Sequence, residues 1–293
     1  MARDPRADIL EDDLFSKQRP TIHRVHANPS PSINVKQWMR AINPREPAIL
    51  HKGKIWHFSD EEKQHLLLAT AAFTFALGIL MAGSVFGIGK EGLNQWIAIL
   101  LLSMPVMLIA VGPAFLLHEI GHKIVAKKYG CWAEFRVDPS GLKFGIALVA
   151  LTGILFMAPG AVMVAGLVTR RQNGHIAIAG PAVNFGLFLI GIPIGGILLG
   201  LTGATESAAY LDSGAINLKA MIFDVVYFWI FANLGLGFFN MIPFGPLDGA
   251  KIKDWSEPVW FFSFMTFIAI IYMWWNGIFS PIDDATLRIA EWF

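Results

Sequence analysis

Long apolar stretches separated by short polar ones fill most of the chain from residue 59 to residue 278. A helix that crosses a bilayer needs roughly 20 apolar residues, and several stretches reach that length. The pattern predicts five spanning helices, at about 66–88, 96–122, 175–201, 221–241 and 259–278. Residues 141–166 are also apolar, but their glycines and β-branched alternation favour short strands or a re-entrant hairpin at the membrane surface. The expected fold is an all-α polytopic membrane protein, with about five to six transmembrane helices and a short membrane-associated β-hairpin.

The two ends of the chain differ from this apolar core. Residues 1–58 are polar and rich in proline, which predicts an extended or partly ordered cytosolic arm. Ser59 and Glu62 have the spacing of a capping box, in which both side chains satisfy free backbone donors at a helix start. The transmembrane core is therefore expected over 59–280, and a short tail over 281–293. The polar N-terminus shows no secretory signal, so an internal segment would direct membrane entry.

Composition agrees with a membrane protein and narrows its chemistry. Hydrophobic residues make up 55% of the chain and charged residues only 15%, whereas soluble domains carry about 25% charged residues. A net charge of +1 provides no basic field for nucleic acid, which is not an expected partner. Cys131 is the single cysteine, which excludes an intrachain disulfide and a thiolate metal cluster.

The distribution of lysine and arginine predicts the orientation in the membrane. With residues 1–65 in the cytosol, five spans place 123–174 and 242–258 on the same side. Of the 23 lysines and arginines, all but Lys90, Lys219 and Arg288 then lie on the cytosolic side. Because cytosolic loops carry the excess of positive residues, the N-terminus and the opening of the active site are expected to face the cytosol.

A candidate metal site lies near the end of the second apolar stretch. His118 and His122 are four residues apart, so a helix places both imidazoles on one face, as zinc binding requires. Glu119 lies about 100° around the helix from His118, close enough to take a proton from a water at the metal and pass it to a leaving amine. The alternative is two histidines that hydrogen-bond to other polar groups on an ordinary helix. Ionisable groups at membrane depth are costly and usually functional, which favours the metal site.

A zinc site needs a third protein ligand, and Asp248 is the candidate at comparable depth. It follows the fourth apolar stretch, where Pro243 and Gly245 break the helix and let the carboxylate turn inward. Asp-Gly is also a common turn dipeptide, so spacing alone leaves open a simple loop at this position.

Two motifs in this order resemble the site-2 protease family of intramembrane zinc metalloproteases. They are H-E-x-x-H at 118–122 and N-x-x-P-x-x-P-L-D-G at 240–249. The resemblance covers roughly residues 60–255. It implies one Zn²⁺ ion held by His118, His122 and Asp248, and cleavage of single-span membrane proteins, often regulators, within or near their spanning segment.

The resemblance also implies roles for residues around the metal. Asn184, in a G-P-A-V-N motif, matches a residue thought to stabilise the reacting substrate through its amide; an interhelical hydrogen bond is the alternative. Asn240 is expected to support the turn around Asp248 or to contact substrate, and Pro243 to support the same turn. In the family the region of 141–166, which contains Gly160, supplies an edge strand that pairs with unwound substrate; a purely structural hairpin is the alternative.

Two other functions remain possible on the residues alone. A non-catalytic membrane adaptor or chaperone of the same fold would have lost Glu119 or a ligand, and neither is lost. A metal transporter would carry acidic or histidine residues at successive depths, whereas here they cluster at one. No stretch is long enough for an inserted PDZ domain, and no nucleotide-sensing domain follows the last span, so the chain looks most like prokaryotic members in a cell membrane. The natural substrate, its cleavage site, the oligomeric state and the gating of access do not follow from the sequence.

Overall fold

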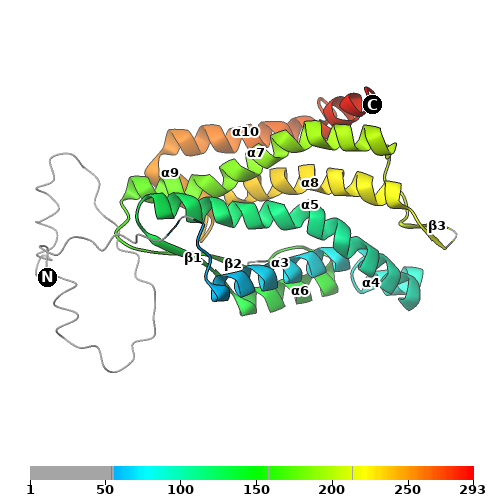
Figure 1. The fold of residues 1–293 in the computed structure, drawn as a ribbon, viewed down its shortest axis with the longest axis horizontal. Helices are drawn as coiled ribbons and strands as arrows, with labels where there is room; N and C mark the ends of the chain where they lie inside the picture. Colours follow the sequence, from blue (N-terminus) through cyan, green and yellow to red (C-terminus); the bar gives the residue numbers. More distant parts are fainter. Residues whose placement is uncertain (1–53, 55, 158, 213) are drawn as a thin grey trace, which may run out of the picture.

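The computed structural model describes residues 54, 56–157, 159–212 and 214–293. Within them, five helices are long and apolar enough to cross a membrane, and they lie roughly side by side (Figure 1). They are α3 (Asp60–Met81), α5 (Leu93–Lys128), α7 (Arg170–Thr202), α8 (Leu218–Asn240) and α10 (Glu257–Trp275). Together with a small two-stranded antiparallel sheet, these helices confirm the predicted all-α polytopic fold. The residues of the predicted arm before Lys54, and Ile55, lie outside the described residues.

The first two spans differ in their bounds from the prediction. Helix α3 ends at Met81 because Gly83 and Ser84 follow with φ of 77° and 58°, a backbone conformation that a helix cannot continue. A short helix, α4 (Phe86–Glu91), leads into α5. Helix α5 is 36 residues long and bends along its length, as its internal prolines predict (Figure 1). The predicted metal motif therefore lies within α5, about two to three turns before its end.

The apolar region 141–166 is only partly extended, whereas short strands or a re-entrant hairpin were predicted over the whole of it. Its first part is a helix, α6 (Pro139–Thr152), whose buried residues Leu142, Gly145 and Val149 follow helical spacing and pack toward α3. Only β2 (Gly160–Ala165) is extended, and its partner β1 (Trp132–Val137) precedes the predicted region. The two strands pair antiparallel, from Trp132 opposite Ala165 to Val137 opposite Gly160. The prediction failed because the glycines of α6 allow close packing and do not end the helix.

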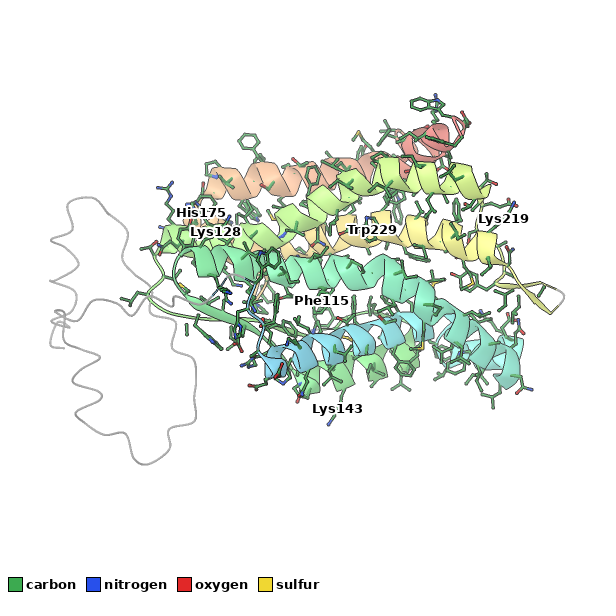
Figure 2. The ribbon with its side chains drawn as sticks, viewed as in Figure 1. Phe115, Lys128, Lys143, His175, Lys219 and Trp229 are labelled. Atoms are coloured by element: carbon green, nitrogen blue, oxygen red, sulfur yellow. The ribbon has the colours of Figure 1, made fainter. Side chains whose placement is uncertain are left out.

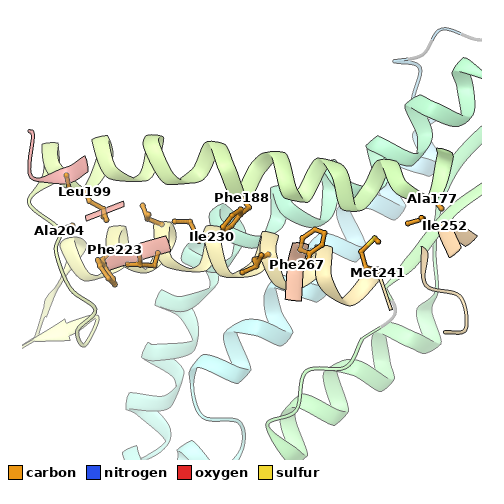
Figure 3. Packing of buried hydrophobic residues seen from close by; sticks show 13 residues of the cluster. Ala177, Phe188, Leu199, Ala204, Phe223, Ile230, Met241, Ile252 and Phe267 are labelled. Atoms are coloured by element: carbon orange, nitrogen blue, oxygen red, sulfur yellow. The ribbon is translucent and has the colours of Figure 1, made fainter. Parts of the chain in front are cut away.

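A hydrophobic core between α7 and α8 holds the second half of the chain together. Figure 3 shows Phe188, Ile230 and Phe267 in its middle, and Ala177 with Ile252 at the end next to α9 (Asp248–Trp255). At the other end, a two-stranded ribbon, β3 (Leu211–Asp212) and β4 (Ala215–Ile216), leads into α8. The last residues form a π-helical turn, Pro281–Thr286, and α11 (Leu287–Ala290), which both pack on α7.

Near the metal motif, a buried ion pair joins α3, α5 and β1. Ser59 caps α3 as predicted, accepting a hydrogen bond from the Glu62 N–H at 3.1 Å. The Glu62 carboxylate does not complete the capping box. It pairs with Lys123 and accepts the Phe135 N–H at 3.1 Å. Both charged side chains are buried. Each neutralises the other, whereas a lone buried charge would have no such partner.

Candidate metal centre

Three buried side chains from two elements converge on one point. His118 and His122 lie one turn apart on α5, and Asp248 is the first residue of α9. Helix α9 begins close beneath the end of α8, because a Cβ at residue 249 would lie only 2.1 Å from the Met241 carbonyl oxygen. Gly249 thus allows the approach that places Asp248 beside the histidines.

The distances between the three side chains fit a zinc ion. The His118 and His122 Nε2 atoms are 3.0 Å apart, and Asp248 Oδ2 lies 3.0 Å from His122 Nε2 and 3.4 Å from His118 Nε2. Tetrahedral zinc, with bonds of about 2.0–2.1 Å, holds its ligand atoms about 3.3 Å apart. With neutral imidazoles all three atoms are acceptors, an arrangement that a bound cation satisfies. The residues present therefore fit the metal.

The second nitrogen of each imidazole has a fixed partner. His122 Nδ1 lies 2.7 Å from the Ile176 carbonyl oxygen, and His118 Nδ1 lies 2.6 Å from Asn184 Oδ1. A carbonyl oxygen only accepts, so each Nδ1 carries the proton and each Nε2 keeps its lone pair for the metal. Such outer partners fix both the tautomer and the ring orientation of metal-binding histidines.

Asp248 divides its two oxygens between two tasks. Oδ2 faces the imidazoles, while Oδ1 accepts a hydrogen bond from Lys251 Nζ at 3.1 Å. The positive charge of Lys251 favours the ionised form of the Asp248 carboxyl, which burial of that group opposes. The carboxylate is thus anionic and oriented for a cation. Lys251 was not among the predicted site residues, although its position three residues along the same helix is compatible with this contact.

Gly180 lets helix α7 approach the histidines closely. A Cβ at this position would lie 2.5 Å from His122 Nε2 and 2.6 Å from His118 Cε1. Any other residue would occupy the space that the two imidazoles fill. The glycine of the G-P-A-V-N motif is therefore part of the site, a role that the sequence analysis did not assign to it.

Glu119 and Asn184, predicted to be catalytic, have different surroundings. Glu119 is half-buried, and no described residue donates a hydrogen bond to its carboxylate, so its oxygens are available to water. Asn184 is fully buried, and its Nδ2 donates to the Ala114 carbonyl oxygen at 2.9 Å and to Asn233 Oδ1 at 3.0 Å. Asn233 was not predicted at all.

The three predicted support residues are Asn240, Pro243 and Gly160. Asn240 Nδ2 donates to the Leu236 carbonyl oxygen within α8, at 3.0 Å. Pro243 is exposed in the loop before α9, and Gly160 is the first residue of β2. No hydrogen bond or ion pair among the described residues joins the side chains of these three to the ligands, and their roles stay predictions.

Residues 106–254, which include the whole cluster, match the model of peptidase family M50. The chain belongs to this family. It is the site-2 protease family of membrane zinc metalloproteases, so the resemblance drawn from the two motifs is confirmed and zinc is the cofactor of the peptidase.

Named relatives agree with this assignment. "Putative zinc metalloprotease MJ0611" of Methanocaldococcus jannaschii is 34% identical over an aligned part that covers 53% of the chain and 72% of the relative. "Zinc metalloprotease MJ0392" of the same organism is 31% identical over 50% of the chain and 33% of the relative. Mycobacterium tuberculosis has "Putative zinc metalloprotease Rip3", 26% identical over 68% and 41%. The chain thus spans less than half the length of the second and third relatives. No solved structure is significantly similar to the chain.

Proposed function

We propose that this M50 peptidase hydrolyses a peptide bond in or near the transmembrane segment of a single-span membrane protein, as a step of regulated intramembrane proteolysis. The convergence of Asp248 with His118 and His122 of α5, a helix of membrane-spanning length, carries the proposal. A protease site at that depth reaches segments that soluble proteases cannot.

The ligands and Glu119 divide the chemistry between them. His118, His122 and Asp248 would hold the zinc ion, which when bound acidifies a water and polarises a carbonyl oxygen. The Glu119 carboxylate takes a proton from the attacking water as its oxygen bonds to the scissile carbon. Glu119 then gives this proton to the amide nitrogen as the carbon–nitrogen bond breaks. A catalytic contact from Asn184 stays a prediction, since both of its amide hydrogens are bonded within the protein here.

The free edge of β2 is the proposed docking place for unwound substrate. The Phe135 N–H donates to Glu62, so it points away from β2. In an antiparallel pair, two residues opposite each other either both bond to one another or both point outward, so the N–H and C=O of Val162, opposite Phe135, point away from β1. Bonded and non-bonded pairs alternate along an antiparallel ladder. Three residues after Phe135, the Asp138 N–H donates to the Pro159 carbonyl oxygen at 3.1 Å, which is the bonded pair that this alternation requires. Because β2 has no second strand neighbour in the described part of the chain, these groups are open to an extended peptide.

We further propose that the active site opens toward the cytosol, with the protein in a prokaryotic cell membrane. Lys128 and His175 lie at one end of the bundle, and Lys219 lies at the other (Figure 2). The metal motif is close to the Lys128 end, which also holds most of the basic loops.

Glu119→Gln tests the proposed reaction. A single-span reporter in the same membrane should be cleaved by the wild type and roughly 10²–10⁴-fold more slowly by the variant, because the proton carrier is lost. Bound zinc should be equal in both proteins, since Glu119 is not a ligand. Glu206→Gln, an exposed glutamate outside the cluster, is the matched control and should cleave normally. Cleavage by Glu119→Gln at the wild-type rate with full zinc would refute the mechanism, and a wild type that binds zinc but cleaves no reporter would favour an adaptor.

A further inference from the structure

Asn233 is a fully buried polar residue that the proposed reaction does not use. It lies on α8, near the middle of the bundle, and its side chain is 0% exposed. Its Nδ2 donates to the Trp229 carbonyl oxygen at 2.9 Å, and its Oδ1 accepts from Asn184 Nδ2 at 3.0 Å. An unpaired amide is costly in such surroundings, so a buried asparagine is expected to serve the group that it bonds to. The side-chain partner of Asn233 is Asn184, which points to a role of Asn233 in holding Asn184.

The hydrogen bonds from Asn233 to His118 run in a fixed direction. The Ala114 and Trp229 carbonyl oxygens, one for each amide, can only accept. Asn184 must therefore turn Nδ2 toward Ala114, which leaves Oδ1 to face His118 Nδ1 at 2.6 Å. Asn233 is oriented in the same way by Trp229, so its Oδ1 faces the remaining hydrogen of Asn184.

We propose that Asn184 and Asn233 form one positioning relay, which sets the tautomer and ring orientation of His118 for zinc. Both hydrogens of the Asn184 amide are committed, one to Ala114 and one to Asn233, so Asn184 acts on the metal site through His118. The relay rests on the proposed function only through the zinc site and does not depend on which substrate is cleaved.

Loss of Asn233 would loosen the site without touching it. One hydrogen of Asn184 would then be left without a partner in an apolar interior, and the Ala114 carbonyl oxygen alone would hold the amide in its orientation. A larger share of the molecules would then hold a rotated Asn184, which presents an N–H to His118 Nδ1 and favours the tautomer with its proton on Nε2. That tautomer cannot bind the metal, so zinc affinity falls although all three ligands remain.

Zinc affinity, measured by competition with a chelator on the purified full chain, tests the relay. Asn233→Leu, close in volume, should weaken zinc binding on the order of tenfold, the lower end of the range for outer partners of a metal-bound histidine. It should also change the visible absorption spectrum of the Co²⁺-loaded protein, which reports ligand geometry. Asn233→Ala removes the amide and adds no larger side chain. Whichever of the two variants folds can be used to test the relay. Unchanged affinity and spectrum in a folded variant would overturn the proposal, as would failure of both variants to fold, which would assign Asn233 to stability alone.

Tyr210→Phe is the control for a bond to the same helix. It removes the hydrogen bond from the Tyr210 hydroxyl to Asp224 Oδ2 of α8, at 2.7 Å, which is also buried but lies outside the relay. Zinc affinity and the Co²⁺ spectrum should not change. An equal loss in this control would show that the loss of any buried hydrogen bond to α8 suffices, and would overturn the relay.

Asn184→Leu separates positioning from direct catalysis. The relay predicts a loss of zinc affinity at least as large as that of Asn233→Leu, and no further loss when the two changes are combined, because they act through one path. Unchanged affinity with slower cleavage would assign Asn184 to the substrate and overturn the relay. If the reporter is never cleaved but these affinities fall as expected, the relay stands and the proposed proteolysis fails.

Discussion

Gly180 sets how closely α7 approaches the metal ligands, and this makes a single methyl group decisive. The position where its Cβ would stand is already filled by the His118 and His122 rings. Alanine favours a helix over glycine by about 1 kcal/mol. A substitution to alanine here would therefore stabilise α7 while it disturbs the geometry of the metal site.

Gly180→Ala is expected to weaken zinc binding at least about tenfold, because both imidazoles must move and their outer hydrogen bonds must break. Chelator competition measures the affinity, and thermal unfolding of the metal-free protein shows whether the fold survives. Gly186→Ala is the control on the same helix, since a Cβ there meets nothing within 4 Å. Equal zinc affinity in the two variants would contradict the close packing of α7 on the histidines.

Sequence spacing predicts only part of this site. His118, Glu119 and His122 share one helix turn, so their relation follows from local geometry. Asp248 needed the family resemblance, since 126 residues separate it from His122. Asn233 and Lys251 were missed because an asparagine in an apolar helix, or a lysine after a turn, has many ordinary explanations. Only tertiary packing shows what each one contacts.

At the scale of elements, hydropathy predicts the spans well and the hairpin region poorly. The length of an apolar stretch can be read from the local sequence. Whether a short apolar segment becomes a helix such as α6 or a paired strand depends on what it packs against elsewhere in the chain. β1 is polar enough to look like a loop, and Glu62 of α3 covers its outer edge. That contact leaves β2 as the open edge of the described sheet.

Val162→Pro is expected to slow cleavage of the reporter at least about tenfold while zinc affinity stays unchanged. Proline removes only the outward N–H of Val162, and a strand edge tolerates this because no bond to β1 is lost. Reporter cleavage and chelator competition on the same preparations give the two readouts. Val162→Thr keeps the N–H in a similar shape and should cleave normally. Normal cleavage by the proline variant would remove this edge from substrate binding.

At the scale of the whole molecule, the ends of the bundle differ in charge. Lys128 at one end belongs to the basic loops near the metal site, and Lys219 belongs to the sparsely charged end (Figure 2). This difference in charge follows directly from the sequence, because successive loops lie on alternate sides of the membrane and the lysines and arginines can be counted in each loop. It did not predict that the C-terminal residues fold back on α7 at the end away from the metal, since α11 is too short to be recognised by periodicity.

Cysteine labelling in intact cells tests the proposed orientation. Cys131 is buried, and burial raises the pKa of its thiol, so it should react slowly; Cys131→Ala removes it altogether. In that background, Lys219→Cys should react with a membrane-impermeant maleimide added outside the cells. Lys128→Cys, which is also exposed in the structure, should react only after the membrane is permeabilised. The reverse pattern would place the metal site at the outer surface and the basic loops against the positive-inside rule, so that substrates would have to present their scissile bond from the other side.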